Sequence, residues 1–267
     1  MDLQAEYDNR ARVPDHPRHL AAWQRDAAAW REACPRAELA LSYGEGEREA
    51  LDLFHPAAAG DAPLAMFIHG GYWQALDRSF ASHCARGLNG RGFAVAVPSY
   101  DLCPAATLGG IVGQLRDAAA FLFRRHRRRI LAVGHSAGGH LAAMLLGTDW
   151  RGLDPALPAD LVAAALPVSG VFEIEPLLGT TIGAALRLTP AEARALSPRF
   201  LPSPRRPLHC LVGGAESGEF LRQSRDFAAA WGGTFESAPG ADHFTVIAPF
   251  ADPASAIVAR AAALAPP

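Results

Sequence analysis

The stretch that decides the fold is Ile130-Leu131-Ala132-Val133-Gly134-His135-Ser136-Ala137-Gly138-Gly139, which leads into the apolar run ending at Leu146. The residues 130–133 predict a buried strand, and the residues 139–146 predict a helix. Between them, Gly134–Gly138 fits the pattern G-x-S-x-G, which a chain of this length contains by chance about one time in ten. The strand–turn–helix setting makes the pattern informative, because such a tight turn lifts a serine hydroxyl above the end of the strand. Ser136 is therefore a candidate nucleophile, and the alternative is a glycine turn with an inert serine.

Apolar runs and amphipathic stretches alternate along most of the chain. Buried runs that alternate with helices are typical of βαβ units, in which helices cover both faces of a parallel sheet. The sequence therefore predicts an α/β fold with a mostly parallel central sheet of about eight strands. We expect strands at 37–43, 50–54, 64–68, 93–97, 130–133, 161–168, 208–212 and 234–237, and helices at 19–34, 78–88, 108–123, 139–146, 220–231 and 254–264.

The chain shows no internal repeat and no linker, so we expect one domain spanning residues 1–267. Its first part, about residues 1–37, is expected to be a helical segment that precedes the first strand. Between Glu173 and Pro207 the pattern breaks into short helices punctuated by Gly and Pro. An insertion that forms a small cap over the strand ends is expected to have this pattern.

A serine hydroxyl is a weak nucleophile near neutral pH and needs donors for the oxyanion that its attack creates. The sequence His69-Gly70-Gly71-Tyr72-Trp73 follows an expected strand, and its glycines leave backbone N–H groups free to face a cavity. We expect the amides of Gly70, Gly71 and Ala137 to form the oxyanion hole, Ala137 being at the start of a helix whose dipole adds to the effect. A simple turn after a strand is the alternative.

The serine also needs a general base. We expect a histidine to be that base and an acid to orient the histidine, both following the serine in the chain. His140 and His209 fall inside an expected helix and strand, so His243, in a loop before the last helix, is the candidate base. The candidate acid is Glu216, just beyond the strand 208–212. Other acids fit less well: Glu219 suits the helix N-terminus, Asp226 lies inside the helix, and Asp242 adjoins the histidine.

Composition limits the partners. Half of the residues are hydrophobic and the formal net charge is −2, which gives no electrostatic reason to expect nucleic acid or an anionic membrane. The basic run 124–129 is interpreted as a solvated helix end. The polar N-terminus, the lack of a long apolar run and four scattered cysteines favour a reduced cytoplasmic protein, with one disulfide as an alternative. The expected partner is a small-molecule substrate, and a homodimer is left open.

The motifs His69–Trp73, Gly134–Gly139 and Asp242-His243-Phe244 together resemble those of the kynurenine formamidases (arylformamidases). This family belongs to the hormone-sensitive-lipase-like esterase branch of the α/β hydrolases. The resemblance covers nearly the whole chain, because Tyr7-Asp8-Asn9-Arg10 with Pro14 and Pro98–Leu102 with Pro104 are also similar. One departure is Glu216, where the family usually has aspartate.

The resemblance implies an α/β-hydrolase fold and hydrolysis of N-formyl-L-kynurenine to L-kynurenine and formate through a formyl-serine, with no cofactor and no metal. Tyr72 and Trp73 would offer an aromatic wall to an aryl substrate, unless they pack in the core. A carboxylesterase acting on small acyl or aryl esters needs the same residues and is the nearest alternative. An inactive hydrolase fold that serves as a binding protein is the alternative from another class. A metal-dependent formamidase is disfavoured, because no clustered ligand spacing occurs.

Overall fold

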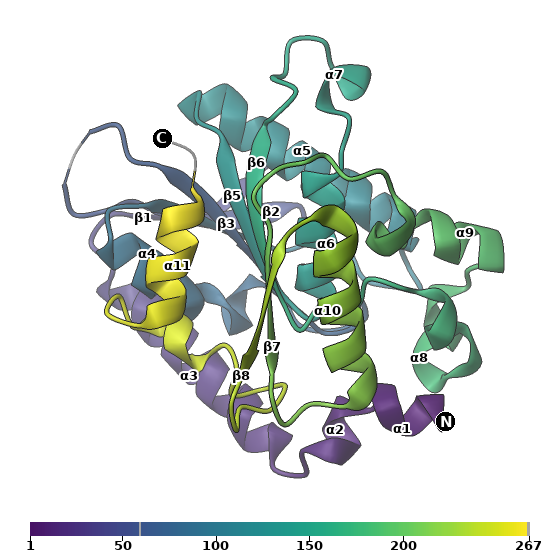
Figure 1. Cartoon of the computed structure of the whole chain (residues 1–267). Coiled ribbons are helices and arrows are strands. Elements are labelled where there is room, and N and C mark those ends of the chain that lie inside the picture. The colour runs from purple at the N-terminus through teal and green to yellow at the C-terminus, as the bar shows by residue number, and fades with distance from the viewer. Residues whose placement is uncertain (59, 266–267) are drawn as a thin grey trace.

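The computed structural model describes residues 1–58 and 60–265 of the chain. Its centre is an eight-stranded sheet with the order β1-β2-β4-β3-β5-β6-β7-β8 (Figure 1). The β1–β2 and β2–β4 pairs are antiparallel and the other neighbours are parallel, which confirms the expected mostly parallel sheet. The strands are β1 (Ala37–Ser42), β2 (Ala50–Phe54), β3 (Leu64–Ile68), β4 (Ala94–Pro98), β5 (Ile130–His135), β6 (Val162–Val168), β7 (His209–Gly213) and β8 (Thr234–Ala238).

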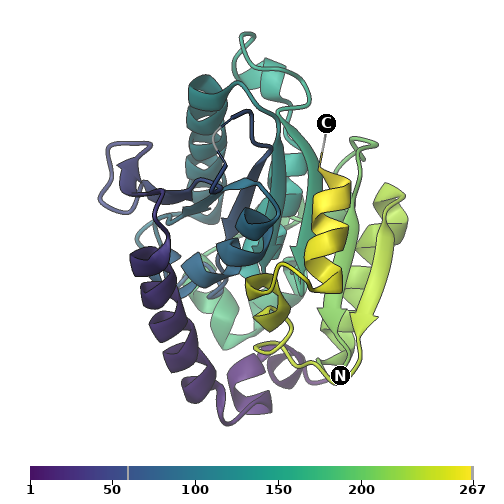
Figure 2. The same cartoon turned by 90° about the vertical axis from the view of Figure 1, so that its left-hand side faces the viewer.

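Alternate side chains of the central strands enter two separate hydrophobic cores, because successive residues of a strand point to opposite faces. In β3, Leu64, Met66 and Ile68 belong to one core, whereas Ala65 and Phe67 belong to the other. Helices cover both faces (Figures 1 and 2). The first core holds residues of α5 (Leu108–His126), α6 (Ala137–Leu146) and α10 (Gly218–Trp231), and the second those of α3 (His16–Ala33), α4 (Ala85–Gly90) and α11 (Ala256–Leu264).

The expected strands agree with the observed ones to within two residues at each end, because continuous apolar runs mark them clearly. The helix expected at 78–88 is wrong: two 3-10 turns, η1 (Arg78–Phe80) and η2 (Ser82–Cys84), precede the short α4. Arg78 gives the reason. Its Nε pairs with the buried carboxylate of Asp52 at 3.1 Å, and its backbone N–H donates to Ser99 Oγ at 3.1 Å. These tertiary contacts override the local helical preference.

The first part of the chain is helical, as expected for residues 1–37: two short helices, α1 (Leu3–Tyr7) and α2 (Asn9–Arg12), precede α3. Separate bounds were expected only for the helix at 19–34. Tyr7 joins them to α10: its hydroxyl donates to Glu219 Oε2 at 2.8 Å and accepts from Gln223 Nε2 at 2.6 Å. Figure 1 shows α1 and α2 beside α10 and α8, at the end of the sheet where β7 ends. The N-terminal segment therefore lies across the edge at which the parallel strands end.

The segment expected as a cap contains four short elements. Its α8 is tied to the rest of the molecule by three hydrogen bonds. Gln74 Nε2 donates to Ile182 O at 3.0 Å, and Gln4 Oε1 accepts from Thr181 N at 2.9 Å and from Thr181 Oγ1 at 3.2 Å. This arrangement places the segment next to the loop after β3 and next to α1. The elements are η3 (Glu175–Gly179), α8 (Thr181–Leu186), α9 (Pro190–Ala195) and η4 (Pro198–Phe200); a further short helix, α7 (Trp150–Leu153), precedes β6.

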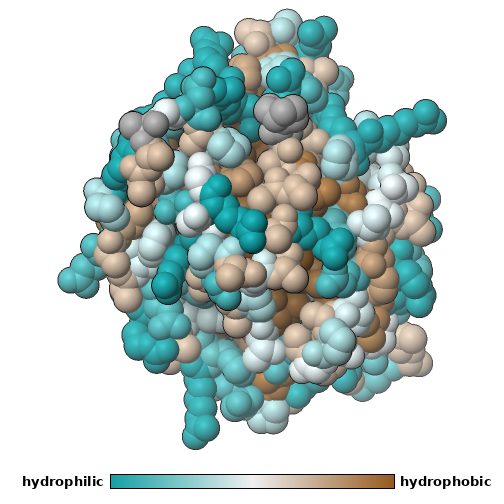
Figure 3. Space-filling model, turned by 60° about the vertical axis from the view of Figure 1, so that its left-hand side comes forward, coloured by the Kyte–Doolittle hydropathy of each residue, from teal (hydrophilic) through white to brown (hydrophobic). Residues whose placement is uncertain are grey.

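The surface mixes polar and apolar side chains. Figure 3 shows one face, on which hydrophilic side chains project between smaller hydrophobic patches. Within the described residues, every helix is too short or too polar to cross a membrane. Cys34, Cys84, Cys103 and Cys210 are all buried as free thiols, so the disulfide alternative does not apply to this structure.

Candidate active site

Ser136 lies between β5 and α6 with φ 57° and ψ −119°, a backbone conformation that residues other than glycine rarely adopt. The neighbouring glycines make this turn possible. A Cβ at Gly134 would lie 2.1 Å from Gly138 O, and a Cβ at Gly138 would lie 2.0 Å from Ile68 O. The Ser136 N–H donates to Val168 O at 2.8 Å, which fixes the turn against β6. The serine therefore sits on the tight strand–helix turn that its sequence predicts.

The loop after β3 brings Gly70 and Gly71 beside this turn. A Cβ at position 70 would lie 3.0 Å from the Ser136 Cβ, and Gly71 has a φ of 107°, which favours glycine. In the described part of the chain, the amides of Gly71 and Ala137 donate to no protein acceptor. Ala137 is the first residue of α6, so its N–H belongs to the positive end of the helix dipole. These amides can stabilise an oxyanion formed above the serine.

Glu216 and His243 form a buried pair, although 26 residues separate them. Glu216 Oε2 accepts a hydrogen bond from His243 Nδ1 at 2.6 Å, and the side chains are 0% and 7% exposed. Glu216 Oε1 accepts from the Gly213 N–H at 2.8 Å and from the Ser169 hydroxyl. The carboxylate is therefore fixed from three sides. With Nδ1 donating to it, the histidine keeps Nε2 as its basic nitrogen.

Ser136 and His243 line the same cavity. His135 connects their loops, because its Nε2 donates to His243 O at 2.8 Å and the two imidazole rings lie 4.7 Å apart. Burial lowers the pKa of His135 well below its usual value, so this side chain stays neutral. Among the described residues no hydrogen bond joins Ser136 Oγ to His243, and such bonds often tighten only when substrate is bound.

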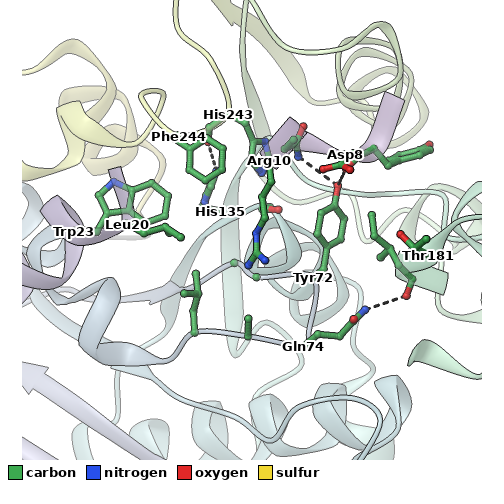
Figure 4. A pocket seen from close by; sticks show the side chains of 18 of the residues that line it. Asp8, Arg10, Leu20, Trp23, Tyr72, Gln74, His135, Thr181, His243 and Phe244 are labelled. Carbon is green, nitrogen blue, oxygen red and sulfur yellow. Dashed lines mark hydrogen bonds between the residues drawn. The ribbon is translucent and has the colours of Figure 1, made fainter. Parts of the chain in front are cut away.

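The cavity has a volume of about 430 Å³, and Ser136 and His243 are among the residues that line it. Figure 4 shows His243 and His135 on one side of this cavity. Aromatic side chains of Trp23, Tyr72 and Phe244 lie around it, and the Trp23 and Phe244 rings are 5.7 Å apart. Gln74 and Thr181 bound it on the side of α8. A mainly apolar cavity of this size with a few convergent polar groups is typical of a small-molecule site.

Tyr72 lines the cavity, but Trp73 does not. The Tyr72 hydroxyl donates to Tyr7 O at 2.5 Å and accepts from Asn9 Nδ2 at 3.3 Å, and burial raises the pKa of Tyr72 well above its usual value. Trp73 is fully buried and packs edge-on against His140, with ring centroids 5.0 Å apart. The expectation that Trp73 offers a wall to the substrate is therefore wrong, and packing in the core describes its role.

The other histidines and acids considered have local partners. His140 Nε2 donates to a backbone carbonyl at 2.8 Å, and His209 Nδ1 contacts a threonine hydroxyl at 2.7 Å. Asp242 accepts two backbone N–H groups at 2.8 Å each, and Glu219 and Asp226 pair with one arginine. Within residues 1–58 and 60–265, no three His, Cys, Asp or Glu side chains are grouped as metal ligands.

The sequence analysis missed Ser169, which follows β6 and donates to Glu216. One signal could have found it: Ser169-Gly170 comes directly after an expected strand, and polar residues at the carboxyl ends of parallel strands meet at one edge of the sheet. The cavity-lining side chains of α1 and α2 were also missed. In the sequence, these side chains stand out only as part of the stretch Tyr7–Arg10 that resembles the family. No local pattern shows that they reach the site.

Replacing Ser169 by alanine is expected to lower kcat by about 5- to 30-fold with little change in KM, since a hydrogen bond to a charged group contributes roughly 1–2 kcal/mol here. In this variant Glu216 would keep its hydrogen bonds with the Gly213 N–H and His243 Nδ1 but lose the one from the Ser169 hydroxyl. The matched control is Ser224→Ala, because Ser224 is equally buried and its hydroxyl has no partner among the described residues. Equal activity of both variants in steady-state kinetics would show that Ser169 does not position the acid.

Acid is expected to destabilise the fold. Burial lowers the pKa of His69, His83 and His140 to about 4. In the unfolded chain a histidine has a pKa of about 6.5. Between about pH 6.5 and about pH 4 the unfolded state therefore binds more protons than the folded state, and the free energy of unfolding decreases as the pH is lowered. Each histidine should contribute roughly 2 kcal/mol less at pH 5 than at pH 7. Urea unfolding should show this loss, and His140→Gln should make it smaller; a midpoint independent of pH would contradict the prediction.

A serine on the strand–helix turn, followed in the chain by an acid and a histidine at the ends of later parallel strands, defines an α/β hydrolase. The family model described as BD-FAE matches residues 51–157. The kynurenine formamidase of Salmo salar is 33% identical over 229 residues, which cover 80% of this chain and 77% of that protein. The chain belongs to the kynurenine formamidase family of α/β hydrolases.

Solved structures agree with the α/β-hydrolase fold. A proposed thioesterase from Silicibacter sp. TM1040 superposes with a TM-score of 0.89 at 36% identity, covering 97% of this chain and 98% of that one. An esterase from Pyrobaculum calidifontis superposes with a TM-score of 0.73 over 98% of this chain and 95% of that one. At 17% identity, the second likeness shows the fold alone. The protein is a hydrolase of the formamidase and esterase type.

Proposed function

We propose that this protein is a serine hydrolase that converts N-formyl-L-kynurenine to L-kynurenine and formate. One observation carries the proposal: the buried Glu216–His243 pair and the Ser136 turn meet at one cavity with aromatic walls. Membership of the kynurenine formamidase family supports the choice of an aryl formamide.

In the first step, Ser136 Oγ attacks the formyl carbon while His243 Nε2 accepts its proton. The carbonyl oxygen becomes an oxyanion, which the amides of Gly71 and Ala137 stabilise together with the loop at Gly70. Glu216 holds the ring through Nδ1 and stabilises the imidazolium that forms. Because hydrogen bonds from Ser169 and Gly213 fix the Glu216 carboxylate, the Glu216–His243 pair needs little reorganisation during the reaction.

The tetrahedral intermediate then collapses and the C–N bond breaks. His243 gives its proton to the departing aniline nitrogen, which leaves as the amine of L-kynurenine, and the formyl group stays on Ser136 as an ester. Water attacks this ester with His243 again as base. Formate leaves, and the proton returns to Ser136 Oγ, so the enzyme is regenerated.

The walls of the cavity suit an aryl leaving group. Trp23, Tyr72 and Phe244 present aromatic surface, and aromatic pairs gain roughly 0.5–1.5 kcal/mol beyond the burial of their area. The small formyl group needs only the space between the Ser136 turn and the loop at Gly70. A carboxylesterase acting on small acyl or aryl esters is the second candidate, because an ester differs only in its leaving group and the fold is shared with esterases.

The two candidates are separated by kcat/KM for N-formyl-L-kynurenine and p-nitrophenyl acetate under the same conditions. Aryl esters are intrinsically more reactive than amides. If the formamide is nevertheless the better substrate, the enzyme is adapted to the formamide. We expect kcat/KM for N-formyl-L-kynurenine to be higher by about tenfold or more, which corresponds to about 1.4 kcal/mol. A formamide rate below that of the ester would favour the carboxylesterase. The cytoplasmic location stays a prediction.

A further inference from the structure

The wall of the cavity that α1 and α2 supply contains side chains that the proposed mechanism does not use. Asp8, Asn9 and Arg10 all line it. Apart from histidines, Asp8 and Arg10 are the charged side chains of the cavity, and they carry opposite charges. They are two residues apart in the chain, on either side of Asn9, so the pattern suits a ligand that itself carries both charges close together.

Asn9 has an acceptor without a partner. Its side chain is only 3% exposed, and its Nδ2 donates to the Tyr72 hydroxyl at 3.3 Å. The orientation of this amide is fixed, because the single hydroxyl hydrogen of Tyr72 is used on Tyr7 O at 2.5 Å, so Tyr72 can only accept from Asn9. Asn9 Oδ1 is therefore a buried acceptor with no partner among the described residues. Because Asn9 also lines the cavity, a donor on a bound molecule can supply the missing partner.

Arg10 is a free cation beside the reacting groups. Its side chain is exposed and forms no ion pair with any residue that the structure describes. Figure 4 shows Arg10 extending into the cavity between His243 and Tyr72. A guanidinium is the best side chain for binding a carboxylate, because its planar fork donates two parallel hydrogen bonds.

Asp8 completes the charge pattern. Its Oδ1 accepts from Ala11 N at 3.0 Å and so caps α2, which holds the carboxylate at the start of that helix. Tyr7 anchors the preceding residue through Glu219 and Gln223. The three side chains are therefore carried by a fastened segment and not by a free terminus.

We propose that Asn9 and Arg10, assisted by Asp8, form a subsite for the zwitterionic amino-acid end of the substrate. Arg10 pairs with the substrate carboxylate. The substrate ammonium donates a hydrogen bond to Asn9 Oδ1 and is attracted by the negative charge of Asp8. The proposal rests on the proposed function for the position of the scissile bond, which must lie at Ser136. It adds a reason for selecting an aryl substrate that carries an α-amino carboxylate over a plain aryl amide or ester.

The test compares matched substrates with and without the amino-acid end. One pair is N-formyl-L-kynurenine and formanilide, and the other is O-acetyl-L-tyrosine and p-tolyl acetate. The readout is the ratio of kcat/KM for the zwitterionic substrate to that for its neutral partner. We expect Arg10→Gln to lower this ratio by about 10- to 100-fold, as for a lost charge-assisted hydrogen bond. Asn9→Leu should lower it as well, with the melting temperature recorded to separate binding from folding.

Arg18→Gln is the matched control, because Arg18 is exposed, carries the same charge and does not line the cavity. This variant should leave the ratio unchanged. A ratio near one in the unchanged protein, or the same ratio in Arg10→Gln, would overturn the subsite. If both formamides are inert and both esters react, the formamidase proposal fails and the ester pair still decides the subsite.

Discussion

The Ser136→Ala variant is expected to lose kcat/KM by roughly a factor of 10⁴ to 10⁶, because no other group can form the acyl bond. The remaining activity would come from the oxyanion amides and from binding alone. Steady-state kinetics with N-formyl-L-kynurenine and with an aryl ester measures the loss on both substrates. The loss should be of similar size for both, since the serine acts before the leaving group matters.

The variant should remain folded. Alanine keeps the Cβ of serine, so the turn at φ 57° bears the same strain, and the Ser136 N–H contact to Val168 O is a backbone contact that the substitution leaves intact. Circular dichroism and urea unfolding therefore serve as controls. A folded Ser136→Ala protein with more than a few per cent of the original kcat would remove the serine from the mechanism.

The second large effect is expected for Glu216→Gln, which should lower kcat by about 10²- to 10⁴-fold while KM changes little. Glutamine has nearly the same shape but lacks the charge that stabilises the imidazolium. Its amide also presents a donor towards His243 Nδ1, which favours the wrong tautomer of the ring. Burial of the acid, 0% exposed, makes the lost charge matter more than it would in water.

Glu216→Asp is the informative companion, because aspartate keeps the carboxylate and removes only one methylene group. The shorter side chain keeps the charge but withdraws the carboxylate from its contacts with Ser169, Gly213 and His243. We expect an intermediate kcat, above that of Glu216→Gln and below that of the unchanged protein. If Glu216→Gln were as active as Glu216→Asp, another acid would have to hold His243.

Much of the fold follows from local signals in the sequence. Short apolar runs such as Leu64–Ile68, alternating with longer amphipathic stretches, predict buried strands, and the tight turn at Gly134–Gly138 fixes the link between β5 and α6. The segment 78–88 could not be predicted, because the contact of Arg78 with Asp52 joins distant parts of the chain. The pattern of apolar residues carries no information about such a contact.

The candidate site divides in the same way. Order in the chain and position after strands were enough to single out Glu216 and His243, which the structure joins at 2.6 Å. Ser169 and the side chains of α1 and α2 could not be derived, since only the packed sheet brings them to the cavity. The prediction for Trp73 was wrong because two adjacent aromatic residues in a loop do not show which side chain faces the cavity and which packs in the core.

Covalent labelling by a fluorophosphonate, followed by intact mass spectrometry and peptide mapping, shows whether Ser136 is the nucleophile. We expect one adduct, on Ser136, absent in Ser136→Ala and formed far more slowly in His243→Ala. Activity that survives complete treatment with the probe, or an adduct on a different residue with Ser136 untouched, would contradict this expectation.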